Sequence, residues 1–221
     1  AWVSYLPQAE ILRKKIISLE LRASDDYRLT PEGLADAAAP LAGQKLLILN
    51  QPRNPTGATY SLGQLEELAE VCRATSTIVL ADEIYARTAF DDSQFASMAR
   101  AYPEGTVVTG GLSKDRSAGG YRLGVGVFPP GDPTLVGELL KIAGSTYSCV
   151  AAPIQHAGVV AYALGDEVED WVELSRAINA VVGREAAARA RTLPGAEIST
   201  PGGGFYFTLD LNAHRFELSG F

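Results

Sequence analysis

Side chains of five different chemical types lie in four short segments in the middle of the chain. The segments are Asn54-Pro-Thr-Gly57, Ala81-Asp-Glu-Ile-Tyr85, Gly111-Leu-Ser-Lys114 and Gly120-Tyr-Arg-Leu-Gly124. In that order they supply an amide, a carboxylate, a phenol, a primary amine and a guanidinium. An amine can form a Schiff base with an aldehyde, and a guanidinium can bind a phosphate through two parallel hydrogen bonds. This set of groups therefore suits a cofactor that carries both an aldehyde and a phosphate.

Pyridoxal phosphate is such a cofactor, and each of its polar groups has a candidate partner in these segments. Lys114 can hold the aldehyde as a Schiff base, and Asp82 can keep the pyridine nitrogen protonated so that the ring withdraws electrons. Asn54 and Tyr85 are suitable donors to the ring hydroxyl. Arg122 can bind the phosphate, for which a guanidinium is better built than an ammonium. We therefore predict a pyridoxal 5′-phosphate site without a metal.

The elements that must position these residues are short apolar runs alternating with helical patterns, which is typical of an α/β sheet covered by helices. Strands are expected at residues 16–21, 45–50, 77–81 and 106–109, and a strand at 123–128 is expected to run antiparallel. The run at 45–50 is continuously apolar, as in a strand buried on both faces. Helices are expected at residues 4–13, 133–143, 152–164 and 167–191, and after Thr30 and Ser61.

The predicted strands explain why segments far apart in sequence can form one site. Asn54, Asp82 and Lys114 each follow the end of a predicted strand. Ligands of open α/β sheets bind outside the carboxyl ends of the strands, so we expect these residues to meet in one crevice. Taken alone, Asn54-Pro-Thr-Gly57 is equally an ordinary turn, Asp82 a cap, and Lys114 a solvated loop charge. Their joint order along the chain favours the site.

The four segments together resemble the class I/II aminotransferases, which belong to the fold type I enzymes that use pyridoxal phosphate. The resemblance runs from about Trp2 to Asp210. It implies an α/β large domain with a mainly parallel sheet and helices on both faces, followed by part of a small α+β domain. We expect the large cofactor-binding domain at residues 1–166 and the start of the small domain at residues 167–221.

The resemblance also assigns residues that the spacing does not. Trp2 falls where the family places an aromatic ring against the cofactor, and Ser113 resembles a hydroxyl that some members use on the phosphate. Many members instead have serine three positions before the lysine, where this chain has Gly111. The segment Tyr147-Ser148 is similar to one that reaches the neighbouring subunit in family dimers, so a homodimer is implied.

The resemblance implies an enzyme that transfers an amino group between an amino acid and a 2-oxo acid. Lys114 would act as the catalytic base and acid, with Asp82 and Tyr85 as further catalytic groups. Two alternatives stay open, because a fold and a cofactor site do not choose a reaction. One is a carbon–sulfur lyase or a decarboxylase that uses the same residues. The other is the aminotransferase-like sensor domain of a transcription regulator.

Composition excludes several other classes of function. The net charge of −7 and the absence of a clustered basic run argue against nucleic-acid binding. No stretch has the roughly 18 apolar residues of a membrane span. Cys72 and Cys149 lie far apart, and neither His156 nor His214 lies near the motifs, so we expect a reducing compartment, the cytoplasm, and no metal cluster.

The ends of the sequence suggest an internal piece of a longer polypeptide. The chain starts at Ala1 without methionine and stops at Phe221. On the family pattern, a first phosphate-binding loop would come before Ala1, and the arginine that binds the substrate α-carboxylate would come after Phe221. We therefore expect the 221 residues to be inactive by themselves. An incomplete sequence is the alternative to biological processing.

Overall fold

The computed structural model describes residues 2–91, 95–131, 133–163 and 165–211. Its helices are α1 (Tyr5–Ile11), α2 (Pro31–Ala38), α3 (Leu62–Thr75), α4 (Met98–Ala101), α5 (Pro133–Thr146), α6 (Ala152–Tyr162) and α7 (Asp166–Ala190). Its strands are β1 (Lys45–Asn50), β2 (Thr77–Asp82), β3 (Thr106–Gly111), β4 (Gly124–Val127), β5 (Glu197–Ile198) and β6 (Leu209–Asp210). The short 3₁₀ helices used below are η1 (Ala23–Asp25), η2 (Ala86–Thr88) and η5 (Gly119–Tyr121).

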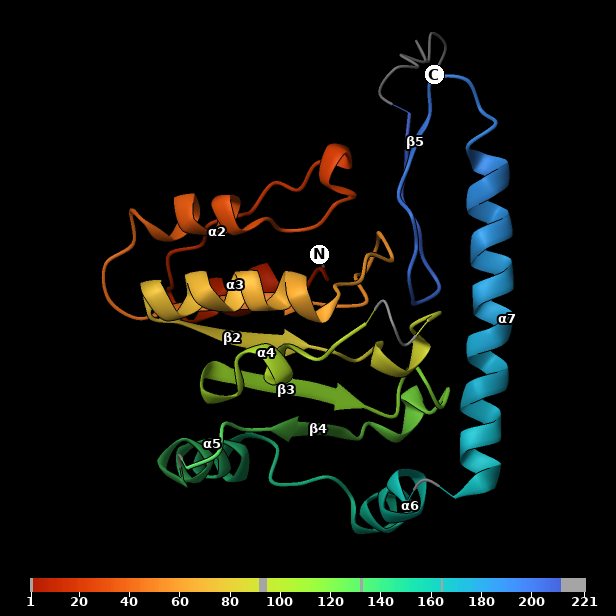
Figure 1. Cartoon of the computed structure of the whole chain (residues 1–221). Helices are drawn as coiled ribbons and strands as arrows, with labels where there is room; N and C mark the ends of the chain where they lie inside the picture. Colours follow the sequence, from red (N-terminus) through yellow and green to blue (C-terminus); the bar gives the residue numbers. More distant parts are fainter. Residues whose placement is uncertain (1, 92–94, 132, 164, 212–221) are drawn as a thin grey trace, which may run out of the picture.

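The main sheet has the order β1-β2-β3-β4, with β1, β2 and β3 parallel and β4 antiparallel to β3. The register places Asn50 beside Asp82 and Asp82 beside Thr109. The three parallel strands therefore end at the same edge. Figure 1 shows the long helix α7 standing upright beside the edge toward which β2 and β3 point. The expected α/β class and the antiparallel fourth strand are confirmed.

Helix α3 closes the core on one face of the sheet. Ser61 and Gln64 form the capping box that begins it, so two backbone N–H groups that lack helical partners are bonded. Leu65, Leu68 and Cys72 follow at helical spacing, and each is at most 1% exposed. Burying one such leucine side chain contributes about 1.5–3 kcal/mol. The packing of α3 on β2, and of α2 on α3, follows from this apolar stripe.

Two sequence expectations about strands were wrong. Residues 16–21 form no strand, because they make no ladder with any strand among the described residues; only Leu19 and Leu21 pack against the core. A β-strand requires ladder hydrogen bonds to a neighbouring strand, and an apolar run in the sequence does not show whether such a neighbour is present. The run at 45–50 does form β1, but it is not buried on both faces, since Leu46 is 62% exposed. In the described sheet β1 lies at an edge, next to β2 alone.

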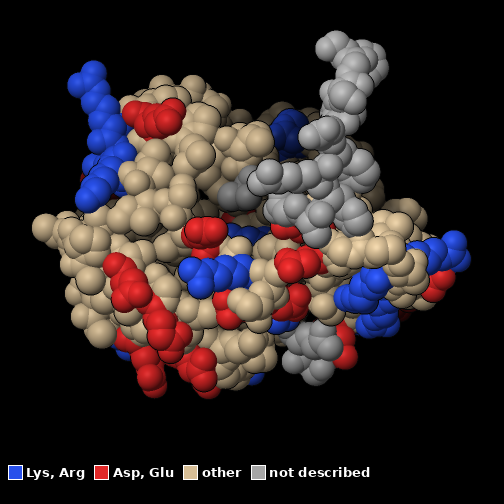
Figure 2. All heavy atoms as spheres, turned by 90° about the horizontal axis from the view of Figure 1, so that it is seen from above, with Lys and Arg blue, Asp and Glu red and all other residues tan. Residues whose placement is uncertain are grey.

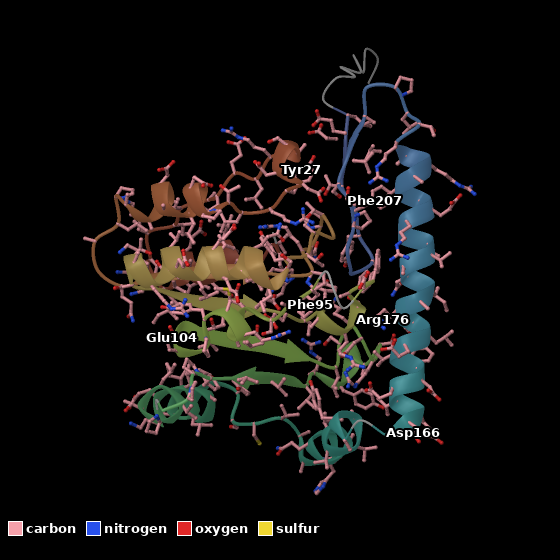
Figure 3. The ribbon with its side chains drawn as sticks, viewed as in Figure 1. Tyr27, Phe95, Glu104, Asp166, Arg176 and Phe207 are labelled. Atoms are coloured by element: carbon pink, nitrogen blue, oxygen red, sulfur yellow. The ribbon has the colours of Figure 1, made fainter. Side chains whose placement is uncertain are left out.

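After α7 the chain returns to the parallel strands' carboxyl ends. Gly202 donates its backbone N–H to Gly57 O (2.8 Å), and Phe90 donates to Gly202 O (2.7 Å). Gly57 has a φ of 71°, and a β-carbon there would lie 2.7 Å from the Cβ of Pro201, so this contact requires glycine. The returning segment then pairs β6 with β5. Figure 3 shows Phe207 on this segment and Arg176 projecting from α7 toward the rest of the chain.

The surface carries charges of both signs. On the face shown in Figure 2, basic side chains lie in small groups beside acidic ones. In the part of the chain that the structure describes, no helix combines the length and the apolar character needed to cross a membrane. The same residues contain no group of three or more potential metal ligands, and both cysteines are free thiols.

Candidate active site

At the ends of β1 and β2, the predicted site residue Asp82 accepts several hydrogen bonds. The Asp82 carboxylate accepts a hydrogen bond from the Tyr5 hydroxyl on Oδ2 and one from Ile84 N on Oδ1 (3.3 Å). Its backbone oxygen accepts from Asn50 Nδ2 (2.9 Å) and from Gln51 N (3.1 Å). A carboxylate has about four lone-pair positions, so Asp82 keeps capacity for one more donor, as a pyridinium N–H would require.

Tyr5 is a site residue that the sequence analysis missed. Burial, and next the hydrogen bond to Asp82, hold the pKa of Tyr5 above its usual value, so its hydroxyl remains a proton donor. The ring of Trp2 lies edge-on to that of Tyr5, with 5.5 Å between centroids and an interplanar angle of 81°. Trp2 is 48% exposed and thus has a free surface next to the Asp82 network. Tyr5 belongs to the segment Trp2-Val-Ser-Tyr5 that the resemblance includes, but nothing in this segment indicates that Tyr5 bonds to a residue 77 positions away.

Tyr85 lies just beyond β2 and is 4% exposed. Burial raises its pKa most, followed by a hydrogen bond with the Tyr206 hydroxyl, while a hydrogen bond with Asn54 lowers it. The rings of Phe205 and Tyr206 pack edge-on against Tyr85 at 5.4 and 6.0 Å between centroids. The structure thus brings Asn54 and Tyr85 together and adds Phe205 and Tyr206, which were not predicted.

Lys114 reaches the same place from the end of β3. Its Nζ lies 5.6 Å from the centroid of the Tyr85 ring and 5.7 Å from that of Phe205. Ring faces attract a cation at this distance, so the two aromatic rings orient the amine. Asn54, Asp82, Tyr85 and Lys114 therefore gather at one edge of the sheet, in agreement with the strand-end expectation.

Ser113 and Arg122 each lie close to Gly119 in η5. A β-carbon on Gly119 would lie 3.8 Å from the Cβ of Ser113, and Gly119 O accepts a hydrogen bond from Arg122 Nη1 (2.6 Å). Arg122 is exposed and has a φ of 54°, in the left-handed region. An exposed guanidinium beside a half-buried hydroxyl is a suitable pair of donors for a phosphate.

The predicted residues fit pyridoxal phosphate as a set. They provide an amine held against aromatic rings, a hydrogen-bonded carboxylate, a phenol next to an amide, and an accessible guanidinium. These are the partners that an aldehyde, a pyridinium, a ring hydroxyl and a phosphate require.

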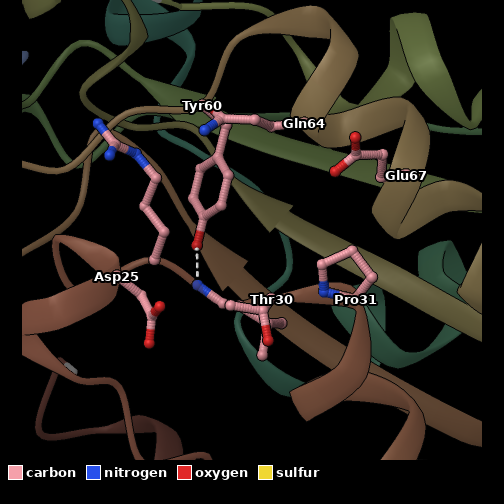
Figure 4. A pocket seen from close by; sticks show the side chains of 8 residues that line it. Asp25, Thr30, Pro31, Tyr60, Gln64 and Glu67 are labelled. Carbon is pink, nitrogen blue, oxygen red and sulfur yellow. Dashed lines mark hydrogen bonds between the residues drawn. The ribbon is translucent and has the colours of Figure 1, made fainter.

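Two cavities in the described structure lie elsewhere. One of about 230 Å³ is lined by Asp25, Thr30 and Glu67, among others, and there the Tyr60 hydroxyl accepts from Leu29 N at 2.7 Å (Figure 4). Another of about 250 Å³ is lined on one side by Glu83, Asp115 and Arg116, which are chain neighbours of the site residues. Neither is lined by any of the seven predicted cofactor residues.

Comparisons with known proteins identify the family. The sequence profile of the family "Aminotransferase class I and II" matches residues 1–218. The aspartate aminotransferase of Geobacillus stearothermophilus is 31% identical over 73% of this chain and 40% of its own length. The asparagine–oxo-acid transaminase of Streptococcus mutans is 29% identical over 93% of this chain and 51% of its own length.

Solved structures give the same result for the fold. An aspartate aminotransferase variant of Thermus thermophilus superposes with a TM-score of 0.86 at 24% identity, over 96% of this chain and 56% of that one. An aromatic aminotransferase from Pyrococcus horikoshii gives a TM-score of 0.81 at 26% identity, over 92% and 53%. The chain thus spans about half the length of the proteins it matches. The resemblance and the fold type inferred from the sequence are confirmed.

Proposed function

Because the chain belongs to the class I and II aminotransferase family, we propose that it binds pyridoxal 5′-phosphate and transfers an amino group between an amino acid and a 2-oxo acid. The observation that carries the proposal is the convergence of Lys114, Asp82 and Tyr85 at the carboxyl ends of two neighbouring strands, β2 and β3. The similarity to aspartate aminotransferases supports the same reaction.

Lys114 has two tasks in this proposal. Its Nζ would hold the cofactor through the aldehyde, and as a free amine it would accept the proton from the α-carbon of the substrate and hold it for return. The bound cofactor supplies an electron-withdrawing ring that stabilises negative charge at the α-carbon. The faces of Tyr85 and Phe205 orient the amine for this proton transfer.

The other residues bind and orient. Asp82, itself fixed by Tyr5, would accept a hydrogen bond from the protonated ring nitrogen on its carboxylate. Asn54 and Tyr85, which lie together, would donate hydrogen bonds to the ring hydroxyl, and the exposed ring of Trp2 would pack against the cofactor. Arg122 and Ser113 bind the phosphate.

We extend the proposal to the oligomeric state, the cellular location and the domain division of the protein. A homodimer in the cytoplasm is supported by the free thiols of Cys72 and Cys149 and by exposed apolar side chains such as Leu140 on α5 and Val181 on α7. The division into a large domain at residues 1–166 and a small one from residue 167 is supported by the start of α7 at Asp166.

Reduction of the loaded protein with borohydride tests the central claim. The mass of the cofactor should then be fixed on the peptide that carries Lys114, and a Lys114→Ala variant should lose the label. Lys141 and Lys45 serve as internal controls, since Lys141 lies in α5 and Lys45 begins β1, away from the carboxyl ends of the strands. A label on either of them would contradict the proposal. Amino transfer to a panel of 2-oxo acids would separate this reaction from lyase or decarboxylase chemistry.

A further inference from the structure

Asn50, the last residue of β1, is 4% exposed and contacts the predicted cofactor residues Asn54 and Asp82. We propose that Asn50 is a positioning residue, which ties the loop carrying Asn54 to the strand end carrying Asp82 and so fixes the spacing of these two cofactor partners. The inference rests on the proposed function, since it concerns the same site.

Both ends of the Asn50 amide are used in this tie. Nδ2 donates to the backbone oxygen of Asp82 at 2.9 Å, and Oδ1 accepts from the backbone N–H of Asn54 at 2.8 Å. A primary amide is the smallest side chain that offers a donor and an acceptor in one plane. Aspartate would keep the acceptor and lose the donor, and alanine would lose both.

The tie matters because β1 and β2 separate at this point. Asn50 and Asp82 are the last pair of the ladder, and Asn54 lies four residues farther on. The loop is closed on itself, since Gly57 N donates to Arg53 O (2.7 Å) and Arg53 N donates to Ala58 O (2.9 Å). The loop is therefore a closed unit, which the Asn50 side chain connects to β2 and Gly202 connects to the returning segment.

The neighbouring residues of both strands serve another purpose. Gln51 donates through Nε2 to Ala96 O (2.8 Å), and Glu83 accepts from Met98 N on Oε1 (2.8 Å). Side chains of successive strand residues point to opposite faces, so this pair holds the segment before α4. Gln51 is fully buried, Asn50 is 4% exposed, and the Gln51 hydrogen bond to Ala96 is similar in length to those of Asn50. It offers a matched control that loses a buried amide without changing the loop.

The consequence of losing Asn50 should appear at Asn54 and Tyr85. Asn54 makes a hydrogen bond with the Tyr85 phenol, and both are proposed to bind the ring hydroxyl. A loop that is free to shift holds this amide less well, and displacements of about 1 Å can reduce turnover by about a hundredfold.

The experiment compares Asn50→Ala, Asn50→Asp and Gln51→Met in the purified full-length protein. Without cofactor, backbone amide exchange at Asn54 should become about tenfold faster in Asn50→Ala, as for one lost hydrogen bond, and remain slow in Asn50→Asp and Gln51→Met. Titration with pyridoxal phosphate, followed by its visible absorbance, should show about tenfold weaker binding for both Asn50 variants. Turnover should fall more than KM rises, with Gln51→Met unchanged.

Three results decide the matter. If the unaltered protein binds the cofactor at Lys114 but Asn50→Ala behaves like Gln51→Met in exchange and affinity, the positioning role is wrong and the proposed function stands. If Asn50→Ala does not fold, Asn50→Asp carries the test, and normal affinity in that variant overturns the role. If the unaltered protein binds no pyridoxal phosphate, the proposed function fails and the role fails with it.

Discussion

The two halves of the candidate site are built in different ways. In the half that would face the cofactor ring, Asp82 is bonded to Tyr5, 77 residues away, and to Asn50, 32 residues away. In the half that would face the phosphate, Arg122 donates to Gly119 O, three residues away, and its side chain is exposed. The ring half is held by contacts between distant segments and the phosphate half by local ones.

This difference indicates different contributions to function. Groups that are fixed before the ligand binds stabilise charge without reorganising, so the ring half should govern turnover. A long exposed side chain must lose rotamer freedom when it binds, so the phosphate half should govern retention of the cofactor. The comparison can be tested by changing one residue in each half.

The largest effect is expected for Asp82→Asn in the ring half. Asparagine keeps the shape and can still accept from Tyr5, but it removes the negative charge beside the ring nitrogen. Turnover should fall by about a hundredfold to a thousandfold, roughly 3–4 kcal/mol, as for one preorganised electrostatic partner. Cofactor affinity should change much less. Asp36→Asn, an exposed change on α2, is the control for loss of one negative charge. Normal turnover in Asp82→Asn would contradict the proposal that the ring half governs turnover.

An intermediate effect is expected for Arg122→Ala in the phosphate half. Loss of a charge-assisted hydrogen bond of about 1.5–3 kcal/mol should weaken pyridoxal phosphate binding by about tenfold to a hundredfold. Turnover at saturating cofactor should be nearly normal. Equilibrium dialysis and saturation kinetics measure the two quantities separately. Arg189→Ala, on the exposed side of α7, is the matched control. A turnover defect that excess cofactor does not restore would show that Arg122 acts on the ring half too.

The sequence predicts the parts of the molecule that local patterns determine. The apolar runs of β1, β2 and β3 and the capping box of α3 were all found, because each depends on residues within a few positions. Parallel strands then place their carboxyl ends together, so the convergence of Asn54, Asp82 and Lys114 followed from topology.

What the sequence did not reveal depends on distant partners. The apolar run at 16–21 was predicted as a strand, but the described chain offers it no ladder. Tyr5, Phe205 and Tyr206 reach the site through contacts with Asp82 and Tyr85 that no local pattern encodes. Phe205 and Tyr206 arrive because Gly202 bonds to Gly57, which lies in the Asn54 loop.

The smallest effect is expected for Tyr5→Phe, which removes one donor to Asp82 while keeping the ring. Turnover should fall by about fivefold, since a single hydrogen bond contributes about 1 kcal/mol. The pKa of Tyr5 is raised by burial and by Asp82, so its hydroxyl stays protonated throughout the usual assay range. The factor should therefore be the same at every pH between about 6 and 9, below the unperturbed tyrosine pKa of about 10.

Tyr102→Phe is the matched control for Tyr5→Phe, because Tyr102 is a buried tyrosine at the end of α4 that packs against Arg73. It should leave turnover unchanged. Suppose instead that the unaltered enzyme loses activity toward alkaline pH and that Tyr5→Phe abolishes this loss. Tyr5 would then ionise within the assay range, which means that its pKa would be lowered rather than raised. The hydrogen bond from Tyr5 to Asp82 would then not fix the ring half before the cofactor binds.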